Sequence, residues 1–432
     1  MKVLIKQAKI ISSSSPFNRQ IKDILITDGV ITQIADTISD KADQVIERKN
    51  LCASIGWMDV FSNFADPGFE YKETLETGAK AAAAGGFTDV MVIPNTNPAV
   101  HNKAQVEYIT QKSKSLAVNI YPIGAITKNI AGTDLAEMYD MHQSGALAFS
   151  DGTNSSQSSG LLLKALQYVK SFNGTVIQIP DDKSIGSNGL MNEGIISTQI
   201  GLPGKPAIAE ELMVARDIKL ARYSDSKIHF TGISSAKSLE YIKRAKEGGI
   251  NVSCSVCPQH LYFTDENLKE YDTNLKLNPP IRTNTDRLAL LKGIADGTVD
   301  CIASHHFPQN KDGKMCEFEF AKEGMIGLES LFGVLGELEI GTLPADRQGW
   351  ESGIEQLVEI LSVNPRKIFG IEIPKIQEGE IACLTLFNAD EEYIFDISMI
   401  KSKSKNSAFL GKKLKGKVIG IINKGKIELN LL

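Results

Sequence analysis

Residues 75–94 have the sequence LETGAKAAAAGGFTDVMVIP, and this segment decides the fold. Its first half, Leu75–Ala84, is rich in alanine and predicts a helix, which the glycines at 85 and 86 then end. The apolar run that follows ends near Pro94 and predicts a buried strand. The paired glycines are therefore a helix C-cap and not a phosphate-binding loop, because no G-x-G-x-x-G motif follows an early strand.

The same alternation of strand-like and helical runs continues from residue 55 to about residue 370. Strands are predicted to end near Phe61, Pro94, Ala125, Ser150, Ile179, Gly232, Ser255 and Ser304. Further helices are predicted at Lys103–Ser113, Ser158–Phe172, Ala207–Arg222, Ala236–Glu247 and Arg287–Ile294. This pattern predicts a TIM-like parallel (β/α)8 barrel, with a doubly wound sheet as the less favoured alternative.

The two ends of the chain differ from the middle in the pattern of elements that their sequences predict. Residues 1–54 contain short alternating strands, with a hairpin signal at Asp28-Gly29, and residues 376–432 contain three more strand-like runs. Neither end is large enough to bury a core alone. The sequence therefore predicts one small β-sandwich domain built from residues 1–54 and 376–432, and a barrel domain over residues 55–375.

Composition excludes several classes of function. The 432-residue chain carries 47 basic and 52 acidic residues, and its net charge of −5 gives no electrostatic case for binding nucleic acid or an anionic membrane. The N-terminus lacks the apolar core of a signal peptide, which predicts a cytoplasmic protein. The six scattered cysteines suggest a reducing compartment, and Cys254 and Cys257 lack a second C-x-x-C to complete a zinc site.

In a (β/α)8 barrel the chemistry lies at the C-terminal ends of the strands. The polar residues just past the predicted strands therefore define the candidate site. They fall in residues 59–68, 151–152, 179–182, 229–232 and 304–309.

Many ordered segments of the chain match one family. They include Pro67–Glu73, Ala81–Phe87, Pro94–Pro98, Gly124–Lys128, Ala148–Gly152, Met191–Gly194, Val214–Asp217, Lys276–Arg282, Gly324–Glu329 and residues 402–416. Through these segments the chain resembles the class I dihydroorotases of the amidohydrolase superfamily over nearly its whole length. The resemblance implies a cyclic amidohydrolase barrel with a split β-sandwich and a role in pyrimidine biosynthesis.

The resemblance also exposes a departure at the metal site. Members of the family carry an H-x-H-x-R motif after the first strand, and here those positions are Phe61, Asn63 and Ala65. The resemblance implies that a bridging aspartate is kept as Asp151. The other changed positions are Ile179 and Gly232 in place of metal-binding histidines, His305 in place of the catalytic aspartate, and Gln309 in place of a substrate-contacting histidine.

Elementary coordination chemistry predicts that zinc is lost. A catalytic zinc needs about three protein ligands and an open position, whereas Phe61 and Ile179 have no lone pairs and Gly232 has no side chain. No cofactor is therefore expected. We expect Phe61 and Ile179 to fill part of the former metal cavity, and Asp151 to require hydrogen-bond donors or a raised pKa. The alternative is a zinc site rebuilt on Asp151 and His305.

Other candidate residues have both a functional and a structural interpretation. The resemblance implies substrate contact by Asn95 and Asn278, although loop-capping asparagines look the same in sequence. His229 is a candidate remnant ligand or a core histidine. The acidic pairs at 181–182 and 210–211 are expected to be solvated or helix-terminal, and Met325, Phe332 and Leu335 to lie in the core.

Three functions remain open, and whether the chain is an enzyme is left undecided. The first is a noncatalytic dihydroorotase homologue that acts as a structural or regulatory partner, since the resemblance implies association with aspartate transcarbamoylase. The second is an active cyclic amidohydrolase with a rebuilt metal site. The third is a binding protein with a small-molecule pocket and no turnover. A homo-oligomer is expected in each case.

Overall fold

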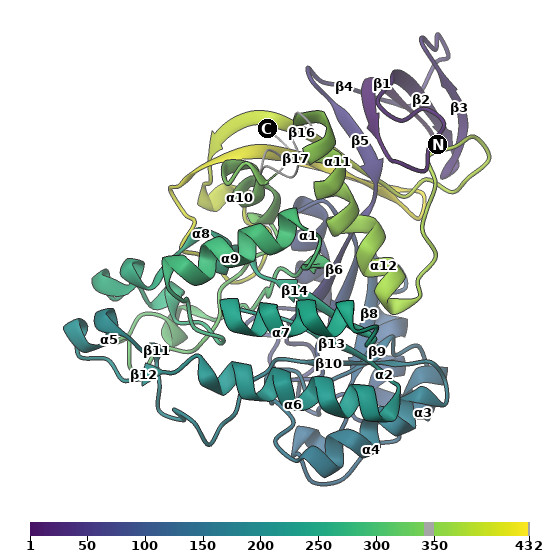
Figure 1. Cartoon of the computed structure of the whole chain (residues 1–432). Coiled ribbons are helices and arrows are strands. Elements are labelled where there is room, and N and C mark those ends of the chain that lie inside the picture. Colours follow the sequence, from purple (N-terminus) through teal and green to yellow (C-terminus); the bar gives the residue numbers. More distant parts are fainter. Residues whose placement is uncertain (341–349, 431–432) are drawn as a thin grey trace.

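A computed structural model describes residues 1–340 and 350–430 of the chain. Its centre is an eight-stranded parallel sheet rolled into a barrel (Figure 1). The strands, in their spatial order from first to last, are β6 (Trp57–Ser62), β7 (Phe87–Val92), β8 (Asn119–Gly124), β9 (Ala148–Phe149), β10 (Thr175–Gln178), β13 (Lys227–Phe230), β14 (Val252–Val256) and β15 (Cys301–Ile302). The prediction of a parallel (β/α)8 barrel is confirmed.

Helices cover the outside of the barrel (Figure 1). The helices of the described residues are α1 (Leu75–Ala84), α2 (Lys103–Ser113), α3 (Met138–Gln143), α4 (Ser159–Lys170), α5 (Ile195–Ile200), α6 (Ile208–Ser224), α7 (Ala236–Glu247), α8 (Pro258–Tyr262), α9 (Asn284–Ala295), α10 (Leu331–Glu337), α11 (Trp350–Val358) and α12 (Asn364–Phe369). The bounds of α1, α2 and α7 are those predicted from the sequence. The short α3 was not predicted, because six residues carry too little periodicity to reveal a helix.

A buried carboxylate joins the first barrel strand to the last. Asp59, in the middle of β6, accepts hydrogen bonds from the backbone N–H of Ser304 at 2.6 Å and from its hydroxyl at 2.8 Å. Ser62 donates a further bond to Asp59 at 2.5 Å and forms a parallel bridge with His306. Because the sheet has no direct β6–β15 ladder, these contacts close the barrel.

Strands from both ends of the chain form a second eight-stranded sheet, at the top of Figure 1. Its strands are β1 (Lys2–Ile11), β2 (Ile21–Thr27), β3 (Val30–Ala35), β4 (Gln44–Glu47), β5 (Cys52–Ile55), β16 (Leu384–Ile394), β17 (Lys413–Asn423) and β18 (Lys426–Leu429). The antiparallel pairing of β5 with β16 unites the two ends. The predicted composite β-domain is thus present, and β5 extends one residue past the boundary predicted between residues 54 and 55.

The composite sheet is tied to the barrel by a buried arginine. Arg366 in α12 donates hydrogen bonds to the carbonyl of Gly56, between the two sheets, at 2.6 Å and to Asp89 of β7 at 2.5 Å. Its side chain is only 1% exposed, so both charges lie away from water. A two-stranded element, β11 (Met191–Asn192) with β12 (Gly204–Lys205), lies apart from both sheets.

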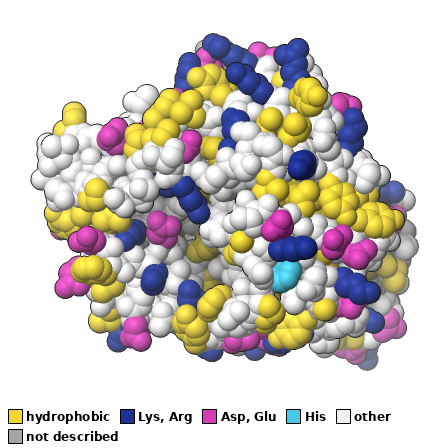
Figure 2. Space-filling model, turned by 90° about the horizontal axis from the view of Figure 1, so that it is seen from below, with side chains coloured by type: hydrophobic (Ala, Val, Ile, Leu, Met, Phe, Trp, Pro, Cys, Tyr) yellow, Lys and Arg dark blue, Asp and Glu magenta, His cyan; other side chains and the backbone are white. Residues whose placement is uncertain are grey.

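The molecular surface shows no face of one charge in the view of Figure 2. Lysine and arginine side chains are interspersed there with aspartate and glutamate, as the small net charge predicts. Among the described residues, no helix is both long enough and apolar enough to cross a membrane.

Closure of the barrel by Asp59 leads to a first prediction. Asp59→Ala leaves the N–H of Ser304 buried without an acceptor and removes the stronger partner of its hydroxyl, and we expect it to lower the free energy of unfolding by about 3 kcal/mol. Asp59→Asn keeps one acceptor oxygen and should cost less. The matched control is Asp36→Ala, whose side chain is 88% exposed and should change stability by less than about 0.5 kcal/mol. Urea denaturation measures all three, and equal effects of Asp59→Ala and Asp36→Ala would contradict the assignment.

Candidate functional site

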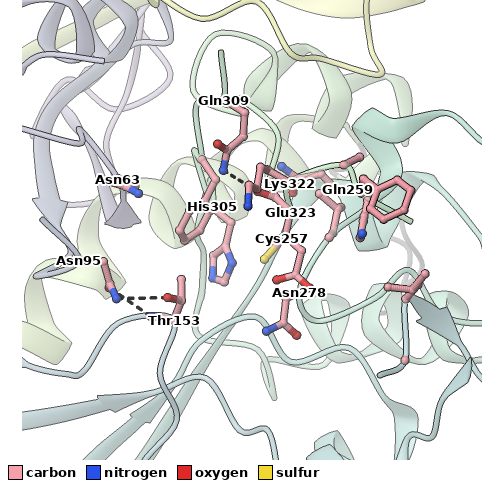
Figure 3. Close-up of a pocket in the computed structure, with 18 of the residues that line it drawn as sticks. Asn63, Asn95, Thr153, Cys257, Gln259, Asn278, His305, Gln309, Lys322 and Glu323 are labelled. Carbon is pink, nitrogen blue, oxygen red and sulfur yellow. Dashed lines mark hydrogen bonds between the residues drawn. The ribbon is translucent and has the colours of Figure 1, made fainter. Parts of the chain in front are cut away.

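A cavity of about 1020 Å³ opens at the C-terminal ends of the barrel strands (Figure 3). Asn63 follows β6, Asn95 follows β7, Thr153 follows β9, Cys257 follows β14 and His305 follows β15, and all five line it. In Figure 3, Asn63 and Asn95 lie on one side of the cavity, with His305 in the middle. The sequence therefore located the candidate site at the correct end of the barrel.

Two of the former metal positions are part of an apolar core. Phe61 and Ile179 are 0% and 1% exposed and belong to one cluster with Ile177 and Ala303 inside the barrel. This agrees with the expectation that their side chains fill space near the former metal site. They do not close the mouth of the barrel, however, since the large cavity remains and neither residue lines it.

His305 is a buried imidazole in contact with that apolar core. Its ring lies 4.9 Å from the ring of Phe61, centroid to centroid, and its Nε2 is 2.8 Å from the hydroxyl of Thr231. Burial lowers the pKa of His305 to about 3, so the ring is neutral at physiological pH. A neutral imidazole cannot replace the carboxylate that the resemblance implies for this position.

The absence of a side chain at residue 232 makes room for His305. A Cβ atom on Gly232 would lie 2.7 Å from Cε1 of His305, and Gly232 has a φ of +70°, a conformation that favours glycine. The ring of His305 occupies the space beside Gly232.

Asp151 is buried and hydrogen-bonded at its carboxylate. The backbone N–H of Thr127 donates to Oδ1 at 2.9 Å and its hydroxyl donates to Oδ2 at 2.6 Å. Burial raises the pKa of Asp151 despite these donors. Asp151 thus has two hydrogen-bond donors and a raised pKa, and it is not among the residues that line the cavity.

The two asparagines predicted to contact substrate both line the cavity. Asn95 is engaged with the loop after β9: its Oδ1 accepts from the N–H of Thr153 at 3.2 Å, and its Nδ2 donates to the Thr153 hydroxyl at 3.2 Å. Asn278 accepts a bond from Lys205 at 3.1 Å. Asn95 therefore has the loop-capping role, whereas Asn278 keeps its Nδ2 unbonded among the described residues.

Two carboxylates expected near solvent are buried. Asp181 is 6% exposed and forms an ion pair with Lys205 at 2.7 Å. Glu210, in the first turn of α6, is 2% exposed and accepts from the backbone N–H groups of Ser234 and Ser235 at 3.1 and 3.0 Å. The expectation of a solvated side chain is wrong for Asp181, whereas the helix-terminal position expected for Glu210 is confirmed, although its carboxylate is buried. In both cases partners distant in sequence supply the donors.

The remaining histidine candidates are structural. His229 is 0% exposed, with Nδ1 2.8 Å from the Ser253 hydroxyl and Nε2 3.1 Å from the Ser255 hydroxyl, and burial lowers its pKa to about 3. His306 faces Glu73 at 3.4 Å, while its neighbour His305 lines the cavity. The two adjacent histidines therefore have different surroundings.

The cysteine pair and the predicted core residues also have clear positions. The six cysteines are free thiols. Cys254 lies inside β14, and Cys257 follows that strand and lines the cavity. Met325, Phe332 and Leu335 are at most 2% exposed, which confirms them as core residues.

Sequence reasoning missed several cavity residues. Lys72, Lys276, Lys322, Gln259 and His260 all line the cavity. Lys72 and Lys276 lie in segments that carry the family resemblance, and Lys322 lies two residues before another, so their proximity to matched segments was the available signal. The conformations of the loops bring these residues to one cavity, and the positions of the strand ends do not predict those conformations.

The donor atoms left at the former metal positions do not fit a zinc ion. Of the six positions where the resemblance implies a metal ligand or the catalytic aspartate, only Asn63, Asp151 and His305 have a side-chain oxygen or nitrogen that could bind zinc. Oδ1 of Asn63 accepts from the N–H of Ala65 at 2.8 Å, and the Asp151 carboxylate and the His305 Nε2 are engaged as described above. Within the described residues, no group of three or more His, Cys, Asp or Glu side chains is placed to hold a metal.

The fold and this strand-end cavity define an amidohydrolase-type barrel with a β-sandwich domain. Residues 54–238 match the family described as Dihydro-orotase-like. A dihydroorotase from Acetivibrio thermocellus is 40% identical over 98% of this chain and 98% of its own, and one from Geobacter sp. is 38% identical over 99% of each. The chain therefore belongs to the dihydroorotase-like family.

Solved structures confirm the architecture. L-Hydantoinase (dihydropyrimidinase) from Arthrobacter aurescens has a TM-score of 0.81 with 21% identity, and the match covers 99% of this chain and 97% of that one. A D-hydantoinase has a TM-score of 0.79 with 21% identity. At this level of identity the likeness concerns the fold alone.

The buried histidines lead to a second prediction, on pH. The folded protein keeps His305 neutral down to about pH 3, whereas the unfolded chain binds this proton near pH 6.5. The free energy of unfolding should therefore fall as the pH drops below 6.5, with His305 contributing up to about 1.4 kcal/mol per pH unit. His305→Asn removes this titrating group, so the free energy of unfolding should depend less steeply on pH between 6.5 and 5, by the equivalent of up to one bound proton. Urea denaturation across this pH range measures the change. An unchanged slope would show that His305 is not a buried neutral group.

Proposed function

We propose that this protein is a noncatalytic member of the dihydroorotase-like family that acts in pyrimidine biosynthesis as a structural or regulatory partner. The observation that carries the proposal is that Oδ1 of Asn63, both carboxylate oxygens of Asp151 and Nε2 of His305 are each engaged by a protein group. Hydrolysis of a cyclic amide at neutral pH needs an activated water and a base. Here Phe61 and Ile179 provide neither, and His305 is hydrogen-bonded and packed against Phe61.

The second candidate function is hydrolysis of dihydroorotate by this chain itself. The relatives named Dihydroorotase cover nearly the whole chain, and they favour this alternative over a regulatory role. They likewise do not support our expectation that no cofactor is needed, and zinc remains the cofactor of this alternative. The two candidates differ in a measurable way, through metal content and turnover.

A third prediction follows for the metal. Protein purified without added metal should contain well below one zinc per chain by elemental analysis, and it should not turn over dihydroorotate, because the remaining donors are engaged within the protein. A stoichiometry near one zinc per chain, lost on His305→Ala, would establish the second candidate. High turnover by the unmodified protein would do the same.

A fourth prediction concerns restoration of the site. A sixfold variant brings back the family's pattern: Phe61→His, Asn63→His, Ala65→Arg, Ile179→His, Gly232→His and His305→Asp. We expect zinc uptake to return before activity, since activity also needs Gln309→His and support around the ligands.

The control for the restored site is Gly232→His alone. It should destabilise the fold, because its Cβ would meet the His305 ring at 2.7 Å, and the added His305→Asp should relieve that clash. A sixfold variant that folds and binds no metal would contradict our assignment of the ligand positions.

The partner we propose is aspartate transcarbamoylase, supported by the family resemblance. We also propose that the chain forms a homo-oligomer and works in the cytoplasm. Size-exclusion chromatography with light scattering, on this protein alone and mixed with the aspartate transcarbamoylase of the same organism, tests both associations. Elution as separate monomers would overturn both.

A further inference from the structure

A second, smaller cavity lies beside the composite sheet, away from the mouth of the barrel. Its volume is about 130 Å³, and it is enclosed by the last residue of α1, the segment before α10, and strands β16 and β17. Figure 1 shows β16, β17 and α10 together at the top of the molecule. No residue of its lining also lines the larger cavity. The smaller cavity is therefore a separate site, which the proposed function does not use.

One buried carboxylate oxygen at this cavity lacks a hydrogen-bond donor. Glu329 is 8% exposed and belongs to the lining, and its Oε1 accepts from the backbone N–H groups of Lys401 and Ser402 at 3.2 and 2.9 Å. Its Oε2 is buried and has no partner among the described residues. A buried carboxylate oxygen without a donor is costly, so this atom is suited to a donor that a ligand brings.

Asn430 places a second acceptor at the same cavity. Its Nδ2 donates to the backbone carbonyls of Ala84 and Val418 at 2.9 and 3.0 Å, which orients the amide and leaves Oδ1 without a donor in the described part of the chain. Tyr393 and Phe395 add aromatic rings to the lining, and the faces of such rings attract cations. A carboxylate oxygen, an amide oxygen and aromatic rings together favour an ammonium group, which has several N–H donors.

The other charged groups of the lining favour a ligand that also carries a negative charge. Lys401 is exposed, and within residues 1–340 and 350–430 its ammonium group has no hydrogen-bond or ion-pair partner. Lys417 forms an ion pair with Glu391 at 2.8 Å. Burial raises the pKa of Tyr393, so its hydroxyl stays neutral. The lining therefore presents one unpaired positive charge, on Lys401, beside the half-engaged carboxylate of Glu329.

We propose that this cavity binds a small α-amino acid with an apolar side chain, its ammonium group on Glu329 and Asn430 and its carboxylate on Lys401. Phe395 and Met399 form apolar walls for the ligand's side chain. A cavity of about 130 Å³ has room for roughly ten non-hydrogen atoms, which admits an amino acid of the size of valine. A simple amine would leave Lys401 unpaired, and a simple carboxylate would face the carboxylate of Glu329.

The ligand would also restrain the backbone that leads to the larger cavity. Glu329 holds Lys401 and Ser402 through Oε1, and Asn406 of the same segment accepts from the N–H of Gln309, a residue of the larger cavity, at 3.0 Å. An ammonium group on Oε2 fixes the carboxylate of Glu329 and with it the two N–H groups that Oε1 accepts. Hydrogen exchange at these two amides should therefore slow on binding.

The ligand test compares L-valine with two molecules that each lack one of its charged groups. 3-Methylbutanoate lacks the ammonium group, and 2-methylpropylamine lacks the carboxylate. Each compound is titrated by calorimetry into the full-length protein in phosphate buffer at neutral pH. We expect L-valine to bind about tenfold or more tightly than either, because only L-valine pairs with both Glu329 and Lys401.

Two variants test the assigned contacts, and a third is the matched control. Glu329→Gln keeps an oxygen for the N–H groups of Lys401 and Ser402 and places an amide N–H₂ where the ligand's ammonium group would bind. Lys401→Met removes the partner of the ligand's carboxylate from an exposed position, where the fold tolerates the change. Each should weaken binding of L-valine about tenfold or more. Lys412→Met removes an exposed lysine outside this lining and should leave binding unchanged.

Hydrogen exchange on the unmodified protein supplies a test that does not depend on the folding of the variants. L-Valine should slow exchange at the backbone N–H groups of Lys401 and Ser402, measured by mass spectrometry, and should not change exchange in α4, at the bottom of Figure 1. Equal binding of the three compounds, or unchanged exchange at these two amides, would overturn the proposal. Neither zinc content nor turnover of dihydroorotate enters these measurements, so they are decided separately from the proposed function.

Discussion

The contact of the Asp59 carboxylate with Ser304 is the constraint on which the site depends. It joins the first barrel strand to the segment after the last one, where no continuous ladder does so. Phe61 lies two residues beyond Asp59, and His305 directly follows Ser304. The clamp therefore sets the 4.9 Å contact between the Phe61 and His305 rings. A buried carboxylate is costly unless donors surround it, and here three donors do so.

Around this clamp lies the scaffold of the family, with a hydrogen-bonded and closely packed centre. The Asp151 carboxylate is held by Thr127, and the glycine at 232 admits the ring of His305. At each of these two positions a neighbour uses the hydrogen bond or the space. Such consistency indicates a packed core with a donor-rich cavity above it.

The sequence predicted the elements well and the environment of individual side chains less well. The barrel strands end close to the predicted positions, because strand–helix alternation is a local pattern of hydrophobicity. Asp181 and Glu210 were expected to be solvated or helix-terminal, and Glu210 is helix-terminal. The burial of both by donors more than twenty residues away, Lys205 and Ser234, was not predicted. Lys322 was missed for the same reason, because only the loop conformation brings it to the cavity.

The sequence by itself determined the family, the barrel and the residue types at positions 61, 179 and 232, because these depend on residue identity and local periodicity. Only the tertiary structure decided which atoms remain free. The oxygens of Asn63 and Asp151 are engaged by nearby donors, while the Asn63 amide nitrogen and the Lys72 and Lys322 ammonium groups are left toward the cavity. Hydrogen-bond partners depend on which groups lie close together across the barrel, and the spacing of residues along the sequence does not reveal this.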